Sequence, residues 1–169
     1  TVQKAIDRGA GNTDADNYQS ITYEGYGPGG IAVLVKCLSD NRNRTVSEVR
    51  HAFSKYQGNL GTEGSVAFLF KKCGYIVIEC DAATFDQLFD QCAELDIEDI
   101  DYDTVATICT SVNQFESVYE TLKTSQYHFL EATQTYLPET YVECDESLAE
   151  TAQQLIDKLE DLDDVQAVY

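Results

Sequence analysis

Long hydrophobic runs are absent from this sequence of 169 residues, and their absence excludes one large class of proteins. A membrane helix needs roughly 18 consecutive apolar residues with few charges, and no stretch of the chain approaches that length. The composition is 43% hydrophobic and 24% charged, which is typical of a folded protein in water. We therefore expect a soluble protein with no membrane partner.

Paired metal ligands are missing as well. The six cysteines include no Cys-x-x-Cys pair, and the two histidines are His51 and His128. A zinc site needs four such ligands, usually in pairs at short spacings, so we predict no metal and no cofactor. Cysteines such as Cys37 and Cys109 fall in apolar patterns and are expected to be reduced residues of a hydrophobic core.

Groups of residues that could perform catalysis are also lacking. His51 lies one helical turn from Ser54, but no third residue is placed to orient the imidazole. The alternating Asp99, Asp101 and Asp103 resemble the start of a calcium loop, yet the glycine and glutamate that such a loop needs are absent. We predict a protein that is not an enzyme and has no catalytic residue, while an enzyme of unknown type stays open as an alternative.

Basic residues are scarce, and nearly all of them lie in the first part of the chain. Residues 1–72 contain nine lysines and arginines against seven acidic residues, whereas residues 73–169 contain two against 23. The formal net charge of −19 argues against nucleic-acid binding by the chain as a whole. A phosphate-binding surface is therefore expected only in the first part. The acidic remainder either steers a polyanion to that side or keeps the protein in solution.

The first part shows the pattern of a strand, a helix and a second strand. Residues 31–39 form an apolar run rich in β-branched residues, which predicts a buried strand. Thr45 and Glu48 have the spacing of a capping box, and apolar residues recur at helical spacing until Gly58, so a helix is expected from 45 to 57. Residues 65–70 are the next expected strand.

A similar pattern is repeated further along the chain and then completed after Pro138. The expected elements are strands at 75–80, 97–102, 106–111, 129–137, 140–144 and 165–169, and helices around 85–95, 115–122 and 148–162, with Asn113 and Glu116 as a second capping box. Two copies of a strand-helix-strand-strand-helix-strand unit can be assembled from these pieces.

We therefore predict the fold class α+β, with two ferredoxin-like βαββαβ domains, each an antiparallel sheet with helices on one face. One domain is discontinuous, 19–72 plus 138–169, and an acidic domain, 73–137, is inserted into it. Residues 1–18 are expected to be the remnant of a helical segment that precedes them, because the chain begins with Thr1 in sequence of helical character.

Four glycines stand before the first predicted strand. Gly25, Gly27 and Gly30 have the Gly-x-Gly-x-x-Gly spacing of dinucleotide-binding loops, but that chemistry requires a helix after the glycines, and here a strand follows. We therefore do not expect a dinucleotide. Together with Gly29, these residues are predicted to offer loop amides to an anion, and the alternative is a glycine turn packed closely on a neighbouring element.

The most polar segment of the first part is Asp-Asn-Arg-Asn-Arg-Thr at residues 40–45, expected to be a loop before the helix. Arginine forks and the free N–H groups of a helix amino terminus suit phosphate oxygens. The polar face of the helix extends this surface. The predicted nucleic-acid-binding residues are Asn41, Arg42, Asn43, Arg44, Arg50, His51, Lys55 and Asn59. The alternative is a solvated helix face whose arginines pair with Asp40 or Glu48.

This part of the chain resembles the YebC family of bacterial proteins and their mitochondrial counterparts. The residues of the loop Gly-Tyr-Gly-Pro-Gly-Gly at 25–30 match those of the family, the similarity is dense from Tyr23 to Phe70, and it returns at residues 159–169. Gln57 departs from the family, which has glycine there. The helical amino-terminal domain of the family is nearly all absent.

The resemblance implies a cytoplasmic regulator of transcription that binds DNA. A ribosome-associated translation factor or translational activator that binds ribosomal RNA, cytoplasmic or mitochondrial, is the alternative. A monomer is expected.

Overall fold

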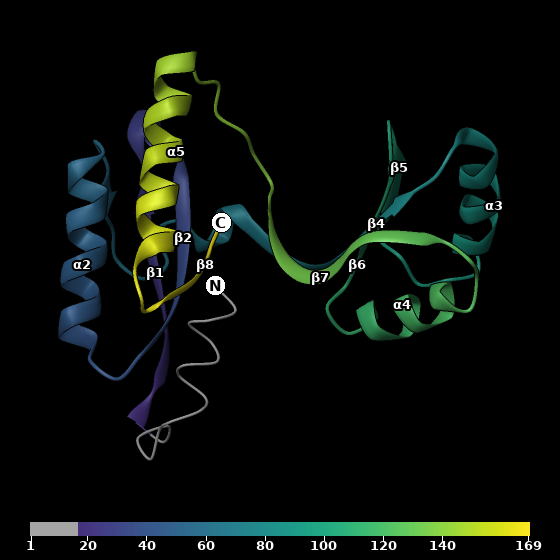
Figure 1. Ribbon diagram of the computed structural model, residues 1–169, viewed down its shortest axis with the longest axis horizontal. Coiled ribbons are helices and arrows are strands. Elements are labelled where there is room, and N and C mark those ends of the chain that lie inside the picture. Colours follow the sequence, from purple (N-terminus) through teal and green to yellow (C-terminus); the bar gives the residue numbers. More distant parts are fainter. Residues whose placement is uncertain (1–16) are drawn as a thin grey trace. The chain divides into compact units, whose positions relative to one another are not determined.

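A computed structural model describes residues 17–169, which form two compact units (Figure 1). The first unit contains the described residues through Leu69 together with Glu139–Tyr169, and the second is Phe70–Pro138. The expected boundaries, 72/73 and 137/138, differ from these by three residues and one residue. The reason is that the first strand of the second unit already begins at Phe70, and Phe70 pairs with Pro138, the last residue of that unit's last strand. The expected amino-terminal remnant, 1–18, lies outside the described residues except for its last two.

The first unit contains a sheet of four strands and two α-helices. Its elements are β1 (Gln19–Tyr26), the 3₁₀ turn η2 (Pro28–Gly30), β2 (Ala32–Ser39), α2 (Arg42–Lys55), β3 (Asn59–Leu60), the 3₁₀ turn η3 (Ala67–Leu69), α5 (Glu146–Asp161) and β8 (Val165–Val168). The strands are antiparallel in the order β3-β1-β2-β8.

The second unit also has four strands and two α-helices. They are β4 (Phe70–Glu79), α3 (Ala82–Cys92), β5 (Asp99–Tyr102), β6 (Ala106–Thr110), α4 (Phe115–Lys123) and β7 (His128–Pro138). The antiparallel strand order β5-β6-β4-β7 and the chain order βαββαβ are those of a ferredoxin-like domain.

The predicted fold class is confirmed: the chain is α+β, with two ferredoxin-like domains, one inserted into the other. The order of elements in the first unit differs from the prediction. This unit begins with the β1-β2 hairpin, and strands predicted at 65–70 and 140–144 are not formed. Residues 65–70 fail as a strand because the N–H groups of Val66 and Ala67 are bound by the Glu24 carboxylate instead of a neighbouring strand. Residues 141–145 have no regular structure.

Each core lies between one face of a sheet and its two helices. In the first unit, Phe53 of α2 and Leu155 of α5 meet alternate residues of β2, such as Val33 and Val35. In the second unit, the apolar stripes of α3 and α4 cover the face of the sheet that contains Ile76 and Ile108. These stripes recur every three to four residues, which is why the helices were predictable.

Helix α4 begins where it was expected, but the predicted capping box of Asn113 and Glu116 is wrong. It begins at Phe115, and the Ser111 hydroxyl accepts a hydrogen bond from the N–H of Gln114 at 3.3 Å, so Asn113 is not the cap. All six cysteines are free thiols, and burial raises the pKa of Cys92 and of Cys109 to about 11. Within residues 17–169, none of the helices combines the length and the apolar character needed to cross a membrane.

Candidate nucleic-acid interface

The amino terminus of α2 is capped by Asn41. The backbone of Asn41 is extended, and its side-chain oxygen accepts a hydrogen bond from the N–H of Arg44 at 3.1 Å. The predicted capping box of Thr45 and Glu48 is therefore wrong. Arg42 and Arg44 belong to the first turn of the helix and do not project from a loop.

Thr45 has another role, which involves residues far apart in the sequence. Its hydroxyl donates a hydrogen bond to the carboxylate of Asp164 at 2.7 Å, and the Ser39 hydroxyl lies 2.5 Å from the Thr45 oxygen. Asp164 follows α5, and only 4% of its surface is exposed. This carboxylate therefore joins the beginning of α2 to the turn between α5 and β8.

Arg44 is paired with the protein's own acidic residues. Its Nη2 lies 2.8 Å from Asp40 and 3.1 Å from Asp164, and hydrogen bonds to these two carboxylates raise the pKa of Arg44. The side chain is 45% exposed. An internal carboxylate thus occupies the place at the start of α2 where a phosphate was expected, and Arg44 stabilises the fold there. For Arg44, the alternative interpretation of an arginine paired with Asp40 is therefore the observed one.

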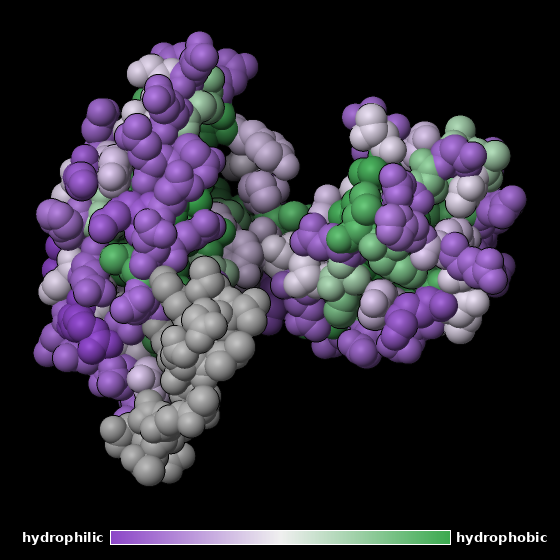
Figure 2. Space-filling model, viewed as in Figure 1, coloured by the Kyte–Doolittle hydropathy of each residue, from purple (hydrophilic) through white to green (hydrophobic). Residues whose placement is uncertain are grey.

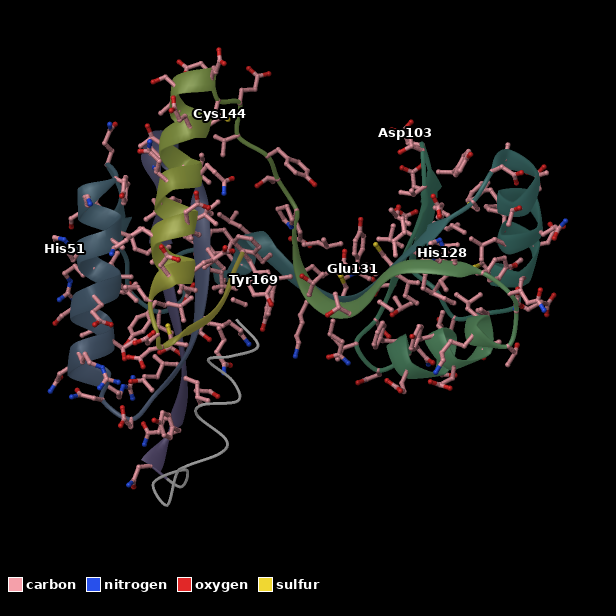
Figure 3. All side chains as sticks on the ribbon, viewed as in Figure 1. His51, Asp103, His128, Glu131, Cys144 and Tyr169 are labelled. Atoms are coloured by element: carbon pink, nitrogen blue, oxygen red, sulfur yellow. The ribbon has the colours of Figure 1, made fainter. Side chains whose placement is uncertain are left out.

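The remaining predicted residues of α2 are exposed. The side chains of Arg42, Arg50 and Lys55 form no hydrogen bond or ion pair within residues 17–169; the ammonium of Lys55 lies 5.3 Å from the centre of the Tyr56 ring. His51 lies on the side of α2 that is turned away from α5 (Figure 3). Together with Asn43, these side chains make up what we call the outward face of α2.

The predicted glycine-loop amides are corrected by the structure. Gly25 is a strand residue, paired with Val33 and Leu60, and a Cβ added to it would lie 2.7 Å from the Phe53 ring. The N–H of Gly27 donates to Ile31 at 2.6 Å, and the N–H of Gly30 donates to Gly27 at 3.2 Å. These groups close a turn, so they are not available to an anion.

Gly29 and Gly30 have the positive φ angles, 71° and 80°, that this turn requires. Leu148 of α5 packs against Gly29. The alternative interpretation, a glycine turn packed on a neighbouring element, therefore describes this segment.

The predicted site residues are spread along the whole length of α2 and beyond its end. Asn41 and Arg44 are at its beginning, whereas Asn59 pairs with Tyr26 beside the glycine turn at the other end. A helix of 14 residues is about 20 Å long, so Asn59 lies far from Asn41 and Arg44 and cannot join them in one phosphate site. Gln57, just after the helix, has a φ of 61°, the left-handed conformation that favours glycine.

Glu24 is a buried residue that the sequence analysis missed. Its carboxylate accepts hydrogen bonds from the N–H groups of Gly64, Val66 and Ala67 at 2.6, 3.0 and 2.6 Å. Burial alone would raise the pKa of Glu24, but the three backbone donors lower it below its usual value. The available signal was an acidic residue in an otherwise small and aromatic segment, followed by a glycine-rich stretch at 61–64.

Charge differs sharply between the two helices of the first unit. Helix α2 carries three arginines and one lysine against one glutamate, whereas α5 carries five acidic residues against one lysine. Both lie over the same face of the sheet, and Figure 2 shows hydrophilic surface on this unit. The outward face of α2 can attract phosphate groups, and α5 repels them.

The fold and the site define a two-domain α+β protein with one cationic helix face; within the described residues, no group of side chains could hold a metal ion. Residues 18–169 match the family model described as TACO1/YebC second and third domain. The chain belongs to the TACO1/YebC family.

Curated relatives and a solved structure agree with this assignment. The chain is 48% identical to the probable transcriptional regulatory protein IL1088 of Idiomarina loihiensis over 100% of its own length and 68% of the relative's. It is also 48% identical to a probable transcriptional regulatory protein of Alcanivorax borkumensis, of which it covers 69%. The crystal structure of the conserved hypothetical protein Aq1575 from Aquifex aeolicus matches with a TM-score of 0.78 and 38% identity, over 99% of this chain and 70% of that one.

Proposed function

We propose that this protein is a non-enzymatic regulator of gene expression that binds the sugar-phosphate backbone of a nucleic acid through the outward face of α2. The observation that carries the proposal is the presence of three exposed cations, Arg42, Arg50 and Lys55, without an acidic partner within residues 17–169. Such groups bind phosphate oxygens, and binding gains free energy from the counterions that the nucleic acid releases.

The neighbouring helix limits how a nucleic acid can approach. A helix inserted in a major groove has phosphates on both sides. Acidic residues of α5 would face one of these sides and repel it. Contact with one stretch of backbone, from the side of α2 away from α5, avoids this repulsion. Binding should therefore depend more on backbone shape than on base sequence.

Double-stranded DNA is the first candidate, because the bacterial relatives are named probable transcriptional regulatory proteins and DNA is the template of transcription. Structured RNA, ribosomal RNA included, is the second candidate, because one-sided backbone contact suits recognition by shape. The proposed place of action is the cytoplasm, with the mitochondrion as the alternative, and the proposed binding form is a monomer.

Titrations of a labelled 20-base-pair DNA duplex and a labelled RNA hairpin test both candidates. We expect the variant Arg42→Ala/Arg50→Ala/Lys55→Ala to lose roughly 30-fold to 100-fold in affinity at low salt. The slope of log K against log salt should fall by about 2 to 3, since each lost phosphate contact removes roughly 0.9 on duplex DNA. The probe that binds more tightly at equal salt identifies the class of target.

A matched control removes three cations from the second unit. The variant Lys71→Ala/Lys72→Ala/Lys123→Ala changes the net charge equally, and we expect its affinity to stay within about twofold of the unaltered chain, because these lysines are outside the proposed contact. Equal losses in both variants would show that α2 is not the site. Absence of binding to both probes by the unaltered chain would contradict the proposal itself.

A further inference from the structure

Strand β7 is the long outer strand of its sheet. Within residues 17–169, four strands end a sheet: β3 has two residues, β8 and β5 have four each, and β7 has 11. A short edge strand offers few main-chain groups to another chain, whereas a long one offers a row of them. Figure 1 shows β7 as the long green strand of the second unit.

One side of β7 pairs with β4, and among the described residues no second strand pairs with its other side. It pairs with β4 from Phe70↔Pro138 to Glu79↔His128, and no strand among the described residues lies beyond it. Proteins usually protect such an edge with lysines or other charged side chains, an internal proline or a β-bulge, and of these β7 has one bulge and one glutamate, Glu131. Strand β7 has no lysine, and its proline is the last residue.

A bulge interrupts the pairing of β7 at an apolar residue. Val77 pairs with Glu131 and Ile78 with Phe129, so Leu130 is the extra residue, and it is 52% exposed. Figure 2 shows hydrophobic surface on the second unit, in the region that β7 crosses. The edge therefore combines main-chain groups with apolar surface, as strands that accept a further strand do.

The surroundings of β7 are acidic. The second unit has three lysines against 13 acidic residues. Glu131 is an exposed residue of β7 (Figure 3), and α4, which packs on the strand through Tyr119 and Phe129, exposes Glu116 and Glu120. The ammonium of Lys123 is held by Glu120 at 3.1 Å.

We propose that the outer edge of β7 binds an extended, basic segment of a partner protein by strand addition. The main-chain groups of β7 supply the pairing, Glu131 selects lysine and arginine side chains on one face of the added strand, and the negative charge of the second unit attracts the segment as a whole. A second copy of this chain is a poor occupant, because two units of the same strong negative charge repel each other. The site is separate from the outward face of α2 and does not depend on nucleic-acid binding.

A synthetic peptide of 11 residues in which lysine alternates with valine or threonine is the probe. Binding by strand addition should slow amide hydrogen exchange in β7 at least tenfold at every second residue, because only alternate N–H groups point away from β4. A peptide of equal charge with prolines in place of every second apolar residue cannot pair as a strand and should bind at least tenfold more weakly. Uniform or scattered protection, or equal binding of both peptides, would overturn the proposal.

Two variants of the full chain test the choice of edge and partner. Glu131→Lys places a repelling charge on β7 and should weaken peptide binding at least tenfold. Glu94→Lys changes the net charge equally at an exposed position after α3 and should weaken it less than threefold. The amide spectrum of each variant shows whether it is folded. Equal losses in the two variants, or concentration-dependent self-association that protects β7 without peptide, would contradict a basic partner at this edge.

Discussion

Helices α2 and α5 lie side by side over one sheet (Figure 1). Their sheet-facing sides are alike, whereas their solvent-facing sides differ in charge. Toward the sheet, both present apolar residues with the same spacing, such as Val49 and Phe53 in α2 and Leu155 and Leu159 in α5. Toward solvent, one helix is basic and the other is acidic. The inward faces determine the fold, so the outward charges were free to differ, and we assign the function to that difference.

The largest expected effect concerns the inward faces, where the two helices should behave alike. Phe53→Ala should lower the free energy of unfolding by about 3 to 5 kcal/mol and Leu155→Ala by about 2 to 5 kcal/mol, because each leaves a cavity in the same core. Urea unfolding measures both. Ser54→Ala, on the exposed side of α2, should change stability by less than about 0.5 kcal/mol. A tolerated Phe53→Ala would show that α2 is not part of the core.

The next effect concerns the one buried carboxylate that joins the two helices. Asp164→Asn removes a charge that is bonded to Thr45 and Arg44, and we expect a loss of about 1.5 to 3 kcal/mol in urea unfolding. Glu160→Gln, an exposed change near the end of α5, is the control and should have almost no effect on stability. If Asp164→Asn were equally neutral, the hydrogen bonds of Asp164 would not contribute to stability. Arg44 would then be available to bind phosphate.

A third test uses the other face of the same sheet, where Glu24 holds residues 64–67. Because the pKa of Glu24 is lowered in the folded protein, its contribution to stability is complete above the usual value of 4.5 and is lost as the pH falls through the folded-state pKa. Unfolding measured between pH 6 and pH 3 should show this decline. The Glu24→Gln variant should be less stable at pH 6 and should lose less stability on acidification. Parallel declines in both proteins would exclude Glu24 as the cause.

The smallest expected effect tests whether the acidic residues of α5 weaken nucleic-acid binding at α2. Neutralising α5 by Glu146→Gln/Glu150→Gln/Asp157→Asn should raise nucleic-acid affinity about threefold to tenfold at low salt, and the gain should disappear near 0.5 M salt. The control Asp86→Asn/Asp90→Asn/Glu94→Gln makes a similar change in and just after α3 of the second unit. An equal gain from the control would mean that net charge, and not the position of α5, governs binding.

The sequence predicted the elements whose signal is local and periodic. The apolar stripes of α2 and α5, the β5-β6 pair and the run at 31–39 all appear in the structure close to their expected bounds. The two predicted capping boxes were wrong because a local pattern cannot show which other groups compete for the same hydrogen bonds. Thr45 is bonded to Asp164, which is 119 residues away in the sequence.

The candidate site could be predicted only in part for the same reason. The basic side chains of α2 were found from the helical period, and Arg42, Arg50 and Lys55 remain proposed contacts. Asn59 was grouped with Asn41 and Arg44 because the sequence contains no information on which strand end meets which helix end. Gly25 was assigned to a loop, although its lack of a side chain serves the close approach of Phe53.

The chain enters the second unit after Leu69 and re-enters the first unit at Glu139, and these two residues of the first unit are in contact. The N–H of Glu139 donates a hydrogen bond to the carbonyl of Leu69 at 2.9 Å, so the two cut ends of the first unit are already neighbours. If residues 70–138 were removed, a short glycine-serine linker could join Leu69 to Glu139 without moving either residue from its place in the first unit. We therefore expect α2 and its supporting sheet to keep their structure after this deletion, and urea unfolding of the shortened chain would check it.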